Sequence, residues 1–154
     1  MEHIWTVLCA NTLLDQSSKR PSLINCISDG TAAHLPANMP PLHIVSSWFV
    51  SNAGEYDVAV ELKRPNGKKV LIGDTAKQCF EDGFAILDIS LDTIVADAYG
   101  RHEIRVKCSK DGKPCLGHAA LFMLKPLPQK VLPSLPVATP KKAKVKTKAK
   151  AKAK

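Results

Sequence analysis

The stretch YDVAVELKRPNGKKVLIGD, residues Tyr56–Asp74, decides the fold class. Its opening residues alternate between apolar and mostly polar side chains, as in a strand with one face in a core; the apolar face holds Tyr56, Val58, Val60 and Leu62. At Arg64–Gly67, proline presets φ and glycine accepts a positive φ, so a turn is expected. The residues after the turn return as a partner strand, and the whole stretch predicts a β-hairpin.

Similar patterns recur on both sides of this hairpin. β-branched, aromatic and aliphatic residues predict further strands at 3–15, 23–28, 43–51, 84–91, 101–109 and 114–124. Asp111-Gly112 is a two-residue hairpin signal. The segment HLPANMPPL, with three prolines, predicts a surface loop. About seven or eight strands without a long helical pattern predict an all-β, antiparallel immunoglobulin-like or C2-like sandwich.

Composition divides the chain into three parts. Residues 1–124 hold the predicted β-sandwich domain. Residues 125–140 contain five of the eleven prolines, so we expect an extended linker of roughly 50 Å. Residues 141–154 consist mainly of lysine and alanine and predict a disordered basic tail.

The charge of the chain lies in that tail. Residues 1–140 carry 14 basic and 14 acidic side chains, so the whole formal charge of +8 comes from the last segment. A flexible polycation binds DNA or RNA by releasing counterions, and lysine without arginine or aromatic residues reads no base sequence. The tail therefore predicts non-specific polyanion binding, with a purely solubilising role as the alternative. The polyanion-binding residues would be Lys141, Lys142, Lys144, Lys146, Lys148, Lys150, Lys152 and Lys154.

Five widely spaced cysteines predict neither a disulfide framework nor a zinc site. A hairpin closed at Asp111-Gly112 makes Cys108 and Cys115 cross-strand neighbours, roughly 5 Å apart at Cα. They form either a reversible redox pair or two reduced core side chains, and a reducing compartment favours the second. Because the chain shows no secretory signal and no apolar stretch of about 20 residues, we expect a cytoplasmic protein.

Other candidate sites have ordinary structural interpretations. His102 and His118 fall in consecutive predicted strands and could approach each other, but scattered strand histidines are the usual case. Trp5 and Trp48 could line a carbohydrate or peptide groove, although their apolar surroundings favour the core. The loop carboxylates lack calcium-site spacing, and recognised catalytic motifs are missing. The sequence therefore predicts no catalytic residue, metal or cofactor.

Two segments resemble known families. WTVLCANTLLDQSSKRPSLINCISD and FAILDISLDTIV with YGRHEIRVKCSKDGKP are similar to the opening and closing patterns of small bacterial proteins of unknown function. This resemblance covers about residues 1–124 and implies a sandwich without assigned site residues. An aromatic usually follows the glycine at the position held here by Arg101. The lysine tail resembles those of linker-histone-like and bacterial histone-like proteins.

These observations predict a non-enzymatic interaction protein. Its sandwich would bind a protein partner, while its tail would keep it near nucleic acid, with a nucleoid-associated location as one consequence. Two alternatives stay open: an interaction module whose tail only aids solubility, and a sandwich that binds a small ligand or carbohydrate through its loops.

Overall fold

The computed structural model describes residues 1–18 and 20–128, and within them all regular secondary structure is β. Eight strands have six or more residues, in agreement with the expected number: β1 (Glu2–Leu14), β2 (Pro21–Cys26), β5 (Leu42–Val50), β6 (Gly54–Lys63), β7 (Lys69–Phe80), β8 (Gly83–Leu91), β10 (Gly100–Lys110) and β12 (Ala120–Pro126). Four shorter strands were not predicted as separate elements: β3 (Asp29–Ala32), β4 (Ala37–Met39), β9 (Ile94–Ala96) and β11 (Lys113–Leu116).

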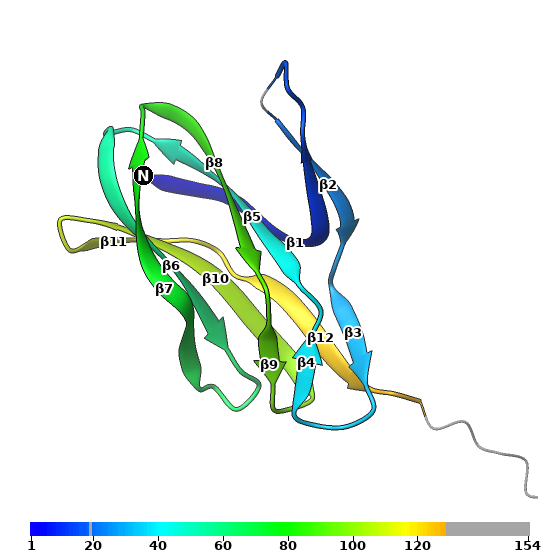
Figure 1. Ribbon diagram of the computed structural model, residues 1–154. Coiled ribbons are helices and arrows are strands. Elements are labelled where there is room, and N and C mark those ends of the chain that lie inside the picture. Colours follow the sequence, from blue (N-terminus) through cyan, green and yellow to red (C-terminus); the bar gives the residue numbers. More distant parts are fainter. Residues whose placement is uncertain (19, 129–154) are drawn as a thin grey trace, which may run out of the picture.

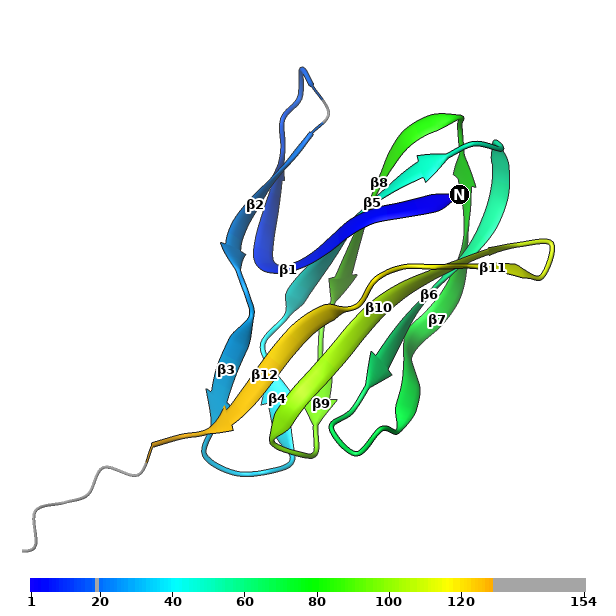
Figure 2. The same cartoon turned by 180° about the vertical axis from the view of Figure 1, so that it is seen from behind.

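The strands form two packed layers, as Figures 1 and 2 show from opposite sides. One sheet has the order β2-β1-β5-β8, and the other has the order β3-β12-β10-β6-β7 with β11 also paired to β10. Pairing is antiparallel except between β12 and β3, which run parallel. The small β4-β9 pair lies at one end of the molecule. The predicted antiparallel sandwich is confirmed.

The core lies between the two sheets and follows the alternation seen in the sequence. Val58, Val60 and Leu62 on β6 are buried, and each pairs with a buried residue of β10. From the other sheet, Trp48 on β5 is completely enclosed. Burial of apolar area at about 25 cal/mol per Å² is the main stabilising contribution of such a core.

Both predicted tight hairpins are present. At the β6–β7 turn, Gly67 has φ of 83° and donates its amide hydrogen to the Arg64 carbonyl at 2.9 Å. At the β10–β11 turn, Asp111 and Gly112 have φ of 51° and 73°, as a type I′ turn requires. The turn residues therefore set the register of both hairpins.

Some boundaries differ from the expectation. β7 continues to Phe80 because it passes through a bulge opposite Val58/Val60, where Gly73 has φ of 70°. The predicted surface loop contains β4, which pairs with β9. The last strand extends to Pro126, and Leu127 still donates to the Ala32 carbonyl at 2.9 Å. β7 is lengthened by further pairing with its hairpin partner β6, whereas β4 and the end of β12 are ordered by hydrogen bonds to segments distant in the sequence.

Among the described residues, no helix is long and apolar enough to span a lipid bilayer.

Candidate functional site

The outer face of the β2-β1-β5-β8 sheet carries a cluster of exposed apolar side chains. The register aligns Trp5 with Ser47 and Ser47 with Ile86 across three strands. In a neighbouring row, Phe49 pairs with Phe84, and their rings meet edge to face with centroids 5.4 Å apart. Phe84 leaves 80% of its surface exposed. Because contiguous exposed apolar surface is a common mark of interaction sites, this face is the first candidate.

Trp5 reaches this face because β1 is bulged. His3 pairs with Trp48 and Trp5 pairs with Ser47, so two steps along β1 match one step along β5, with Ile4 as the extra residue. In a regular strand without this bulge, Trp5 would lie two positions after His3 and share its inward face. The expectation that Trp5 belongs to the core is wrong, whereas Trp48 is a core residue as predicted.

An arm formed by the ends of β1 and β2 makes one wall of a groove beside this face. In its turn, the Asp15 carboxylate accepts hydrogen bonds from the Ser17 hydroxyl (2.6 Å) and from the amides of Ser17 (2.8 Å) and Ser18 (2.7 Å). These bonds lower the pKa of Asp15 to about 2, with the Ser17 hydroxyl as the largest cause. The Asp15 amide also donates to the Arg20 carbonyl at 3.0 Å, which keeps Arg20 and Pro21 beside the end of β1.

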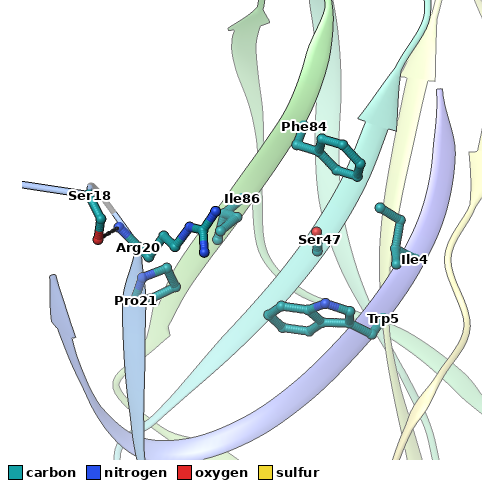
Figure 3. A pocket seen from close by; sticks show the side chains of 8 residues that line it. All are labelled: Ile4, Trp5, Ser18, Arg20, Pro21, Ser47, Phe84 and Ile86. Carbon is teal, nitrogen blue, oxygen red and sulfur yellow. Dashed lines mark hydrogen bonds between the residues drawn. The ribbon is translucent and has the colours of Figure 1, made fainter. Parts of the chain in front are cut away.

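Figure 3 shows the groove between the arm and the sheet. Its volume is about 760 Å³, which lies within the range of small-molecule and peptide-anchor pockets. The arm contributes Ser18, Arg20 and Pro21, while the sheet contributes an apolar floor. The floor consists of Ile4, Trp5, Phe84 and Ile86, with the polar Ser47 among them.

Among the described residues that line the groove, Arg20 is the charged one. Its side chain is exposed, and the ion pairs found among the described residues do not involve it. A guanidinium group binds carboxylate and stacks on aromatic rings. The groove therefore offers an apolar surface with a cationic group at its rim.

A second polar cluster joins the start of β1 to the β11–β12 connection. The backbone amide of His118 donates to His3 Nδ1 at 3.2 Å, so the proton of neutral His3 resides on Nε2. Nε2 then donates to the Thr6 hydroxyl at 2.7 Å, and the Thr6 and Ser46 hydroxyls share a further hydrogen bond at 3.0 Å. Burial and the neighbouring His118 lower the pKa of His3.

This chain of hydrogen bonds is structural. Ser46 is fully buried in the core, so its hydroxyl cannot meet a substrate. Close packing encloses the same region: a Cβ added at Gly117 would lie 2.7 Å from the Val106 carbonyl oxygen and 3.2 Å from the Trp48 ring. We therefore infer that the cluster fixes the start of β1 against the β11–β12 connection.

The predicted cysteine pair occupies the expected register. Cys108 pairs with Cys115 across the β10–β11 hairpin, and both thiols are free. Burial, together with Cys115, raises the pKa of Cys108 to about 12, which makes its thiolate rare at neutral pH. Cys9 and Cys26 form another cross-strand pair, on β1 and β2, that the sequence analysis did not single out. The redox interpretation of Cys108 and Cys115 stays a prediction.

The structure does not bring His102 and His118 together. His102 is buried in the core beside Phe122, with its Nδ1 donating to the Gly100 carbonyl at 3.2 Å, and burial lowers its pKa. His118 instead stacks near His3, with ring centroids 5.1 Å apart. Within residues 1–18 and 20–128, no group of three or more histidine, cysteine or carboxylate side chains is placed to hold a metal ion.

The eight tail lysines, Lys141 to Lys154, lie outside the described residues, as does most of the predicted linker. The polyanion interpretation therefore rests on composition and charge.

No protein-family model matches the chain, and no curated protein matches it either. The candidate site accordingly stands on its geometry.

Proposed function

We propose that this chain is a non-enzymatic interaction protein whose groove binds a protein partner and whose lysine tail holds it near nucleic acid or another polyanion. The observation that supports the partner site best is Phe84, which projects an 80% exposed aromatic ring beside Phe49, Ile86 and Trp5. Aromatic residues clustered beside an arginine are the usual composition of energetic hot spots in protein interfaces.

The groove also suggests what the partner presents. A leucine or aromatic side chain would bury apolar surface against Trp5, Phe84 and Ile86, each fully buried residue contributing about 1.5–3 kcal/mol. A carboxylate next to that anchor would pair with Arg20. The partner segment is therefore apolar with an acidic neighbour.

The tail adds affinity of another kind. Each phosphate neutralised by a lysine contributes about −0.9 to the slope of log binding constant against log salt concentration. The tail therefore gives non-specific binding that weakens steeply with salt. Since residues 1–140 are formally neutral, the polyanion contact would come from the tail alone. Such a protein would work in the cytoplasm, close to the nucleoid, with the resemblance to small bacterial sandwich proteins supporting this setting.

A pair of variants tests the partner site. Phe84→Ala removes the most exposed aromatic ring of the groove, while Leu71→Ala removes a 58% exposed side chain from β7 in the other sheet. Proteins retained from lysate by the natural chain and by Leu71→Ala, but lost with Phe84→Ala, would support the proposal. Equal retention by all three chains would refute it.

A second candidate is a small ligand or carbohydrate. The Trp5 ring lies in the groove with Ser18, Arg20 and Ser47, a set that combines a stacking surface with hydrogen-bonding groups. Saccharide-array binding that disappears with Trp5→Ala would favour this function, and an array without any bound saccharide would argue against it.

A further inference from the structure

Within residues 1–18 and 20–128, the edge strand β8 has no strand paired to one of its sides. The sheet order ends at β8, which pairs with β5 over nine consecutive residues without a register shift. Its sequence, GFAILDISL, contains no proline or lysine. By contrast, the edge strand β7 of the other sheet is interrupted by a bulge and carries Lys69 and Lys77. Proteins protect free edges with such devices, and β8 lacks them.

A slot lies beside this open edge, between the two sheets. Its volume is about 280 Å³. Core-facing side chains from both layers line it, including Val58, Val60 and Ile72 from β6 and β7 and Leu87, Ile89 and Leu91 from β8. The slot therefore lies between the edge strands β7 and β8 of the two sheets.

The slot and the edge of β8 together suit an added strand. Because β7 lines the slot together with β6 and β8, a strand added to β8 would lie over β7. An extended segment in that position would direct alternate side chains into the slot, and small or apolar ones would fit its apolar lining.

The tail of this chain has that pattern. From Lys142 to Lys154, lysine occupies every even position and a small or apolar residue every odd one, namely Ala143, Val145, Thr147, Ala149, Ala151 and Ala153. In an extended strand, these two sets fall on opposite faces. The lysines also match the charge of the β8 flanks: residues 81–92 have no basic side chain, and besides Asp88, which already contacts His43 and Thr12, they carry Glu81, Asp82 and Asp92.

The tail is long enough to reach the slot. The described chain ends just after β12, which is separated from β7 by β10 and β6. Three strand spacings and one sheet separation amount to roughly 15–25 Å, whereas residues 129–141 span about 40 Å when extended. β8 and β12 both run toward the end of the molecule where the described chain stops (Figure 1). A segment returning from that end would pair antiparallel to β8.

We propose that residues 142–148 add to the free edge of β8 as an antiparallel strand, with Ala143, Val145 and Thr147 facing the slot. Backbone hydrogen bonds supply the pairing, and lysines near the acidic flanks of β8 supply electrostatic attraction. The docking stands independently of the proposed function. Combined with that function, it implies competition, since lysines held at β8 are released when the tail binds a polyanion.

Hydrogen exchange of the full chain tests the docking. The matched control keeps the length and composition of residues 142–154 but rearranges them into one lysine block and one block of small residues. Net charge is unchanged, whereas the alternation is lost. We expect amides in residues 83–91 to exchange several-fold more slowly in the natural chain at low salt, with β10 amides unchanged between the two chains.

Three outcomes decide the proposal. Slower exchange in β8 that is independent of protein concentration supports docking within one molecule. Protection that grows with concentration assigns the strand to the tail of a second copy and overturns the same-chain assignment. Equal exchange of residues 83–91 in both chains would overturn the docking, and the edge of β8 would then be available to a partner protein. DNA binding of both chains, measured separately, tests the proposed function, because loss of docking in the rearranged chain can strengthen DNA binding but cannot abolish it.

Discussion

Replacing Phe84 by alanine should cost far less stability than the same replacement at Phe122, because only Phe122 belongs to the core. A fully enclosed phenylalanine buries about 200 Å². Phe122 is 3% exposed, so Phe122→Ala removes nearly all of this area and leaves a cavity, with an expected loss of about 3–5 kcal/mol. Phe84 is 80% exposed. Its remaining contact area of about 40 Å² corresponds to about 1 kcal/mol, with up to about 1 kcal/mol more for its edge-to-face contact with Phe49.

Urea unfolding measures both variants against the natural chain. The free energy of unfolding falls by about 2 kcal/mol per M urea. Phe122→Ala should therefore lower the urea concentration at the unfolding midpoint by about 2 M, and Phe84→Ala should lower it by less than about 1 M. Equal shifts would contradict the description of Phe84 as a free surface residue, and the groove would then be closed in solution. The expected difference also makes Phe84→Ala a folded variant suitable for partner-binding experiments.

Three further predictions concern packing and titration. Gly117→Ala places a Cβ 2.7 Å from the Val106 carbonyl oxygen, so we expect a loss of about 1–3 kcal/mol and a Tm several degrees lower by calorimetry; an unchanged Tm would contradict the close approach. Burial lowers the pKa of His102 below 6.5, so the unfolded state binds a proton that the native state resists. The free energy of unfolding should fall as pH drops below about 6.5, and denaturant titrations of His102→Phe should show a smaller fall. An identical pH dependence in the two chains would contradict the assignment of this effect to His102. With its pKa raised to about 12, Cys108 should resist iodoacetamide at pH 8 while exposed Cys26 reacts, and similar rates by peptide mass spectrometry would be inconsistent with the burial.

The sequence predicts the sandwich because its strands alternate strictly where one face is buried. The hairpin of β6 and β7 and the Asp111-Gly112 turn follow from side-chain periodicity and from residues that accept positive φ. The second half of β7 escapes prediction for a physical reason. Its residues 75–79 are exposed at an edge, so neither face imposes an apolar pattern.

The candidate site was less accessible to sequence reasoning. Trp5 looks like a core residue, and only the extra residue in β1 turns it outward. A bulge depends on the pairing partner, which local sequence does not reveal. Phe84 and Ile86, at alternate positions on β8, could have indicated a strand with apolar side chains on both faces, since Leu87 and Ile89 form the other face. That double-sided pattern was the available signal for an exposed apolar surface.

The most direct test of the account is the salt dependence of binding to a mixed-sequence DNA duplex. It compares the natural chain, a chain ending at Pro140 and the Phe84→Ala variant between about 50 and 200 mM salt. The account predicts a log–log slope of up to about −7 for the natural chain and for Phe84→Ala, with binding lost in the shorter chain. Equal affinity and slope for the shorter chain would contradict the central claim, because the polyanion site would then lie in the domain.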